Sequence, residues 1–182
     1  MKEGHITRAD LLCLLQRFET YEAMGSTSLR NQQKGLVDAL RRFLAEADLA
    51  SIPHTRQGFE DWLDRLTEQA RKVLSASLDS PPCGAVRKGI NLFLRGCVLN
   101  RYLRGAYRLD RIEPWLEAPL DSVVTGKLKR RAGRGALPVW RGMKHLTPAD
   151  SAKFQAFAAQ EARRRGFRSR AHLDMDLWMA KR

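Results

Sequence analysis

Apolar side chains return every three or four positions along most of the chain, which is the pattern of helices with one buried face. Thr7-Arg8-Ala9-Asp10 has the sequence of a capping box and predicts the start of a first helix. A helix over residues 59–74 follows the break at Ser51-Ile52-Pro53. Thr147-Pro148-Ala149-Asp150 supplies an N-cap, a proline in the first turn and an acidic residue, and so predicts a last long helix that ends at Gly166.

Two further helices are predicted as continuous elements, from Ser28 to Ala47 and from Ala85 to Leu103. In the second of these, the apolar positions fall within a sector roughly 100° wide when successive residues are placed about 100° apart. Lys88, Asn91 and Arg95 lie on the opposite side of that helix. The pattern therefore predicts a helix with a buried apolar face and a separate polar face.

Strand patterns are nearly absent from the sequence. Its one cluster of β-branched residues, Val123-Val124-Thr125, is too short to build a sheet, and no Asn-Gly hairpin turn occurs. The sequence contains neither an internal repeat nor a low-complexity tract, and the Pro81-Pro82 break divides helices rather than independent domains. We therefore expect an all-α fold in which residues 1–182 form one domain.

Charge is distributed very unevenly along the 182 residues. Residues 1–83 carry 11 basic and 12 acidic side chains, whereas residues 84–182 carry 22 basic and 8 acidic ones, so the net charge of +13 arises entirely in the second part. A near-neutral helical part joined to a strongly basic part indicates a face for a polyanion. We expect this polyanion to be nucleic acid rather than an anionic membrane surface or an acidic protein.

Several classes of protein are disfavoured by the sequence. No apolar run approaches the ~20 residues of a membrane-spanning helix, and residues 1–5 are not followed by the apolar core of a signal peptide, so we expect a cytoplasmic protein with no membrane partner. Three scattered cysteines and four histidines show no metal-ligand spacing, and we expect no metal and no cofactor. The phosphate-binding motifs of kinases and NTPases and the Gly-x-Ser-x-Gly motif of hydrolases are missing.

Lys88 and Asp121 are the first candidates for chemistry. Lys88 lies near the start of a predicted helix, where the positive helix end and Arg87 disfavour the charged form of its amine, and a lysine nucleophile must be uncharged. Asp121 is placed as a helix N-cap, where it stays ionised and could stabilise a developing cation or accept a proton. A phosphate contact by Lys88 and a purely structural cap at Asp121 remain the simpler interpretations.

The segment from Ala171 to Trp178 places two acidic residues inside an apolar stretch of the most basic part of the chain. On a helix, Asp174 and Trp178 lie one turn apart and project together, so they could offer a carboxylate and an indole ring to one ligand. A core tryptophan beside an ordinary aspartate is the alternative.

Three segments together resemble the helix-hairpin-helix DNA glycosylase superfamily, most closely its branch of archaeal 8-oxoguanine DNA glycosylases. They are Lys88-Gly89-Ile90-Asn91-Leu92-Phe93, Pro119-Leu120-Asp121-Ser122 and the His172-Leu173-Asp174-x-x-x-Trp178 stretch. The resemblance covers residues 84–178 and implies a helical fold with a central cleft that binds double-stranded DNA as a monomer. Pro82-Cys83-Gly84-Ala85 is only a partial version of the family's hairpin sequence.

The resemblance also implies roles for individual residues. Lys88 would attack the sugar and form a Schiff base, with Asp121 stabilising the cationic sugar and transferring protons. His172, Asp174 and Trp178 would close over the extruded base, and the weaker likeness of Phe59-Glu60-Asp61-Trp62 adds Trp62 to the pocket. Such an enzyme excises a base, cleaves the strand as an AP lyase and needs no cofactor.

A second register of the same resemblance is open. Residues 137–144 also look like a glycosylase hairpin, which would make Lys144 the nucleophile and Asp174 or Asp176 the acid. We prefer Lys88 with Asp121, because Pro-Leu-Asp-Ser fits the family's acidic turn and leaves the C-terminal likeness intact. A nucleic-acid-binding protein without catalytic activity, in which Lys88 contacts a phosphate, is the alternative function.

The resemblance leaves the excised base open. Oxidised guanine, in base excision repair, is the first expectation, and hypermodified cytosine of phage DNA, in defence, is the other. Leu92 stands where the archaeal enzymes favour an aromatic residue. We expect basic side chains of the second part to hold the DNA backbone without reading sequence. These are Arg95, Lys127, Lys129, Arg130, Arg131, Arg134, Arg163, Arg164, Arg165, Arg168 and Arg170.

Overall fold

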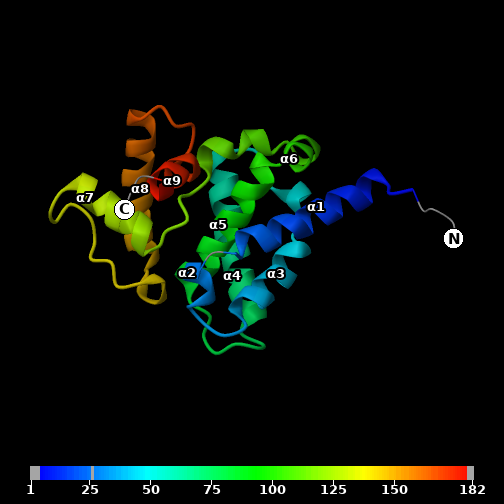
Figure 1. Cartoon of the computed structure of the whole chain (residues 1–182), viewed down its shortest axis with the longest axis horizontal. Helices are drawn as coiled ribbons and strands as arrows, with labels where there is room; N and C mark the ends of the chain where they lie inside the picture. The colour runs from blue at the N-terminus through cyan, green and yellow to red at the C-terminus, as the bar shows by residue number, and fades with distance from the viewer. Residues whose placement is uncertain (1–4, 26, 180–182) are drawn as a thin grey trace.

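The computed structural model describes residues 5–25 and 27–179, and within these ranges the chain forms helices, turns and loops with no β-strand. The predicted all-α class is therefore confirmed (Figure 1). In chain order the α-helices are α1 (Arg8–Ala23), α2 (Thr27–Arg30), α3 (Leu36–Ala45), α4 (Arg56–Leu74), α5 (Cys83–Leu99), α6 (Arg101–Tyr107), α7 (Ser122–Ala132), α8 (Pro148–Arg164) and α9 (Arg170–Met179). Short 3-10 turns lie at Leu49–Ser51, Leu109–Arg111, Glu113–Trp115 and Met143–His145.

The helices gather into two lobes, each with its own apolar core (Figure 1). The first lobe contains α1 to α6, and its core extends along the chain to Leu116. Helix α5 lies at its centre and packs against α1, α3, α4 and α6. Because α5 is surrounded in this way, its apolar residues Val86, Ile90 and Phe93 are fully buried, as the sequence pattern predicts.

The second lobe consists of α7, α8 and α9, which pack on one another around Phe154 and Leu173. Trp140 is partly buried against both cores, and Ala171 of α9 belongs to the core of the first lobe. The two lobes are therefore in direct apolar contact as well as joined by the chain between Leu116 and α7.

The caps explain where several helices begin. The capping box predicted at Thr7 is present, with the Thr7 and Asp10 side chains each bonded to the other's backbone N–H. Thr147 caps α8 through the backbone N–H of Asp150. Asp121 caps α7 and accepts from the backbone N–H groups of Val123 and Val124, both at 2.9 Å.

Two predicted helices are each divided in the structure. The span from Ser28 to Ala47 becomes α2 and α3, separated by a turn in which Gly35 has a φ of +83°, a conformation that suits glycine and breaks a helix. The span from Ala85 to Leu103 ends at Leu99, because the side chain of Asn100 caps a new helix, α6, by accepting from Tyr102 and Leu103. The apolar periodicity continues across both breaks and so conceals them.

The division of charge does not coincide with the division into lobes. The basic part begins at residue 84, at the start of α5, whereas the first core continues to Leu116. The first lobe thus combines the near-neutral part with the first basic residues of the second part. None of the helices in the described part of the chain combines the length and apolar character needed to span a lipid bilayer.

Candidate active site

Lys88 and Asp121 meet where the two lobes face each other. Lys88 lies in the second turn of α5, and Asp121 precedes α7. The Lys88 Nζ atom is 2.5 Å from Oδ2 of Asp121, although the residues are 33 positions apart in the sequence. The side chains are 3% and 1% exposed. The pair is therefore an ion pair inside the protein rather than on its surface.

The two carboxylate oxygens of Asp121 make different interactions. Oδ1 accepts the backbone N–H groups at the start of α7, and Oδ2 faces Lys88. The N-cap interaction fixes the carboxylate with respect to the second lobe, so the position of Oδ2 is determined by the backbone of α7. An N-cap and an ion pair are thus formed by the same side chain.

Ser28 of α2 is the third polar group at this point. Its Oγ atom accepts from Lys88 Nζ at 2.5 Å and donates to Oδ2 of Asp121 at 3.5 Å. From the sequence, Ser28 is expected only to start a helix. No sequence signal connects it to Lys88, because the two residues are 60 positions apart.

A cavity of about 610 Å³ opens beside Lys88, and we call it the Trp178 cavity. One wall comes from α1 and α5 of the first lobe, and the other comes from Pro119 and α9 of the second lobe. Its volume is in the usual range for sites that bind small molecules. Its described lining residues are Glu19, Glu22, Ala23, Gly25, Lys88, Leu92, Arg95, Gly96, Leu99, Pro119, Asp174, Met175, Trp178 and Met179.

Asp174 and Trp178 both line this cavity, as their predicted spacing on one helix suggested. Trp178 is 44% exposed, whereas Asp174 is 2% exposed. Arg95 Nη1 donates to Oδ2 of Asp174 at 2.6 Å, while Oδ1 is buried without a hydrogen-bond partner in the described part of the chain. Burial raises the pKa of Asp174 to about 6, against the opposing charge of Arg95.

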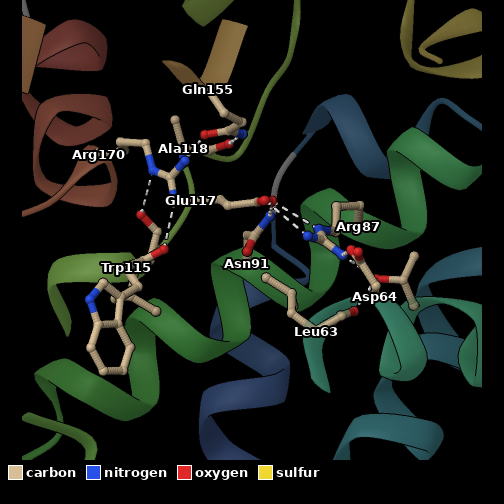
Figure 2. Close-up of polar contacts among 11 residues, drawn as sticks. Leu63, Asp64, Arg87, Asn91, Trp115, Glu117, Ala118, Gln155 and Arg170 are labelled. Carbon is tan, nitrogen blue, oxygen red and sulfur yellow. Dashed lines mark hydrogen bonds and ion pairs between the residues drawn. The ribbon is translucent and has the colours of Figure 1, made fainter. Parts of the chain in front are cut away.

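A second polar cluster contains residues of both lobes and of the segment between them (Figure 2). Arg87 of α5 donates to both carboxylate oxygens of Glu117, at 2.8 and 2.9 Å, and also to Asp64 at 2.7 Å. Asn91 donates to Glu117 at 3.0 Å. Burial alone would raise the pKa of Glu117, but the hydrogen bonds and charge of Arg87 outweigh it and hold that pKa below its usual value.

Two further contacts of this cluster come from the second lobe. Arg170 of α9 donates to the backbone carbonyls of Trp115 and Leu116, and Gln155 of α8 exchanges two hydrogen bonds with the backbone of Ala118 (Figure 2). A cavity of about 550 Å³, the Arg87 cavity, lies here and also reaches Lys88. The segment between the two lobes is therefore held from both sides.

The structure places two residues implied by the family resemblance outside the Trp178 cavity. Trp62 lies on the buried face of α4, with its ring stacked on Phe59 at a centroid distance of 6.2 Å and its Nε1 atom donating to Ser51. His172 is not among the residues that line the Trp178 cavity, and its Nε2 atom lies 3.5 Å from the carboxylate of Glu113. Apolar packing of α4 explains the position of Trp62, and the first-lobe carboxylate explains that of His172.

The alternative pair of Lys144 and Asp174 is not brought together at either cavity. Lys144 is exposed in the turn Met143–His145 and lines neither the Trp178 cavity nor the Arg87 cavity. Asp174 is instead paired with Arg95. The geometry favours Lys88 with Asp121.

Several basic residues expected on DNA are paired with acidic groups. Arg95 is bound to Asp174, and Arg131 and Arg164 both contact Glu161. Lys127 donates to the backbone carbonyl of Leu177. Arg165 and Arg131 both contact Asp176, and Arg168 contacts Glu113.

Four of the expected cations make neither an ion pair nor a side-chain hydrogen bond with any residue that the structure describes. They are Lys129, Arg130, Arg134 and Arg163, and they lie in the last turn of α7, in the loop after it and in the last turn of α8. Arg130, Arg134 and Arg163 are exposed. The second lobe thus carries the cations best placed to meet a polyanion.

Comparison of the chain with models of known protein families, with curated proteins and with solved structures finds no match. Within residues 5–25 and 27–179, no group of three or more His, Cys, Asp or Glu side chains is arranged to hold a metal ion.

Proposed function

We propose that this protein is a DNA glycosylase of the helix-hairpin-helix type, which releases a damaged or modified base through a covalent intermediate on Lys88. The observation that carries the proposal is the 2.5 Å contact between Lys88 Nζ and Asp121 Oδ2, buried between two lobes and adjoining a cavity. A buried lysine beside a carboxylate places a nucleophile next to a group that can accept its proton, which a Schiff-base mechanism can use.

The arrangement of α4 and α5 supports the same assignment. The two helices pack against each other and are joined by residues 75–82, and Lys88 lies in the second turn after that connection. We assign these elements to the hairpin motif. Asp121 then belongs to the acidic turn that caps the later helix α7.

The mechanism begins with a proton transfer from Lys88 to Asp121. The lone pair of the neutral Nζ forms a bond with C1′ of the sugar. At the same time the bond between C1′ and the base breaks, and the electron pair of that broken bond leaves with the base. One proton passes from the new secondary ammonium to the departing base. The C1′–O4′ bond then opens, O4′ takes the proton held by Asp121, and a protonated imine joins Lys88 to C1′. Strand cleavage by β-elimination follows.

The extruded base would occupy the Trp178 cavity. Rotation of a nucleotide out of the duplex costs a few kcal/mol, which stacking and phosphate contacts must offset. Trp178 offers an aromatic ring, and Asp174 lines the same cavity. Oxidised guanine and hypermodified cytosine remain the two candidate substrates.

Covalent trapping with borohydride tests the proposal. Wild-type protein is incubated with duplexes containing 8-oxoguanine and with genomic DNA of phages that carry modified cytosine, and the adduct is measured on a denaturing gel. We expect an adduct with at least one substrate and no adduct for Lys88→Gln. The matched control is Lys144→Gln, which should react like the wild type.

The other outcomes are equally informative. Absence of an adduct with every DNA, together with salt-dependent DNA binding, would overturn the glycosylase proposal and leave a nucleic-acid-binding protein without catalytic activity. An adduct that disappears in Lys144→Gln but persists in Lys88→Gln would assign the nucleophile to the second register.

A further inference from the structure

We infer that Ser28 is a positioning residue for Lys88, which aims the Lys88 amine at the Trp178 cavity and carries a proton between Lys88 and Asp121. The inference rests on the proposed function, because it assigns a role in the reaction of Lys88. It depends on a contact between α2 and α5 that neither the motifs nor the family resemblance pointed to.

The first step of the argument concerns direction. A lysine amine on a flexible four-carbon stem rotates freely unless its N–H groups are held. Lys88 Nζ is held at two points, by Oγ of Ser28 and by Oδ2 of Asp121, both at 2.5 Å. The bond to Cε and these two hydrogen bonds leave one tetrahedral direction of the nitrogen, and Lys88 lines the Trp178 cavity as well as the Arg87 cavity.

The second step concerns the proton. Ser28 Oγ accepts from Lys88 and donates to Oδ2 of Asp121, so the three groups form a closed triangle. A hydroxyl group can accept one proton while it gives up another. A proton can therefore leave Nζ either directly to Oδ2 or through Oγ, and the same route returns it in the later step that opens the sugar ring.

The position of Ser28 in the fold makes this role independent of the second lobe. Asp121 is fixed to α7, whereas Ser28 lies on α2, which packs against α3 in the first lobe. Lys88 is thus held by one group from each lobe. Since α2 and α5 belong to the same lobe, Ser28 keeps Lys88 oriented while Asp121 supplies the charge.

The test compares Ser28→Ala and Ser28→Thr with the wild type, and Ser122→Ala is the matched control because Ser122 is an exposed serine beside Asp121. Single-turnover rates of trapping are measured at saturating enzyme. Loss of a hydrogen bond to a charged group lowers such a rate roughly 10- to 100-fold. We expect that loss for Ser28→Ala, near wild-type rates for Ser28→Thr and Ser122→Ala, and equal DNA affinity for all four proteins.

A proton inventory in mixtures of H₂O and D₂O separates a relay from a structural role. With the relay, more than one proton moves in the rate-limiting step, so the wild-type plot is curved and the Ser28→Ala plot is linear. A linear wild-type plot, or a Ser28→Ala protein that reacts as fast as the wild type, would overturn the inference. Equal loss of rate in Ser28→Ala and Ser28→Thr would also overturn it.

Solvent exchange of the Nζ protons of Lys88, measured by NMR without DNA, keeps this test separate from the proposed function. We expect exchange in Ser28→Ala to be roughly tenfold faster than in the wild type, because one protecting hydrogen bond is removed. Unchanged exchange would contradict the inference even if no DNA substrate were found. Trapping failure by the wild type, in contrast, contradicts the proposed function alone.

Discussion

Lys88 and Asp121 depend on each other at the level of single residues. Each side chain is almost fully buried, and each provides the opposite charge that the other needs. Breaking a buried ion pair by removal of one partner is much more costly than replacing both, because the remaining charge is left without compensation. The stability of the protein therefore contains information about the pair that is independent of any substrate.

A double-mutant cycle measures this dependence. We expect Lys88→Met to lower the free energy of unfolding by about 3–5 kcal/mol, since it leaves the carboxylate of Asp121 buried and unpaired. Asp121→Asn keeps an oxygen atom for the N-cap of α7 but removes the charge. The double variant should be clearly more stable than the sum of the two single changes predicts. Additive effects in urea denaturation would show that the two charges do not interact.

Asp174 gives a prediction on pH. Its pKa is 3.8 in the unfolded chain and about 6 in the folded protein. The protonated form is therefore favoured by folding, and the stabilisation is complete below pH 4 and disappears as the pH rises through 6. The wild type should lose about 2 kcal/mol relative to Asp174→Asn between pH 4 and pH 7.5. Chemical denaturation at several pH values measures the difference, and a difference that stays constant with pH would contradict the prediction.

At the level of elements, the two faces of α5 show what the sequence could predict and what it could not. The apolar face is buried as expected. The polar face is also largely buried, because Lys88 contacts Asp121 at the start of α7 and Asn91 contacts Glu117 in the segment between the lobes. Apolar periodicity predicts which side of a helix faces its own core, but a polar face covered by charged partners from distant segments gives no such pattern.

The difference between local and long-range contacts also explains which site residues have a signal in the sequence. Asp121 has a local signal, since an aspartate before a helix has the sequence of an N-cap, and Asp174 and Trp178 share a helix turn. Ser28 and Glu117 have no local signal, because their partners are 60 and 30 positions away. Long-range polar contacts of this kind depend on the packing of the lobes.

The first turn of α5 gives a prediction at this level. A Cβ atom added to Gly84 would lie 2.6 Å from the backbone oxygen of Met143 and 3.1 Å from Leu146, so α5 and the turn Met143–His145 approach too closely for a side chain. We expect Gly84→Ala to destabilise the protein by roughly 1–3 kcal/mol, measured by thermal unfolding. Gly105 of α6 has open space around it, and Gly105→Ala should be neutral or stabilising by up to about 1 kcal/mol. Equal effects of the two changes would show that the close approach is not important.

At the level of the whole molecule, the proposed function gives the excess positive charge a role in the approach to DNA. Many cations of the second part are engaged with acidic side chains, and Arg130, Arg134 and Arg163 are exposed without an ion pair to the described residues. Phosphate contacts give binding that weakens steeply with salt and does not depend on sequence.

Neutralisation of these three arginines tests their contribution. The triple variant Arg130→Gln, Arg134→Gln, Arg163→Gln should reduce the slope of log affinity against log salt by about 0.9 for each phosphate that is no longer neutralised, so by roughly 3 in total. Fluorescence anisotropy with several duplexes measures this slope, and the reduction should be the same for each sequence. Arg65→Gln, on the near-neutral part, is the control and should leave the slope unchanged. A reduction that depends on the sequence would instead indicate contacts to bases.

Lys88 and Asp121 belong to parts of the chain with separate hydrophobic cores, so their contact forms only while the two lobes are packed together. The amine is supplied by α5 and its carboxylate by the start of α7, so neither half of the architecture is competent alone. A substitution far from Lys88 that only loosens the packing of the second lobe against the first should abolish the proposed covalent chemistry while helix content stays intact. On gradual heating, loss of reactivity should therefore precede loss of the helical circular-dichroism signal.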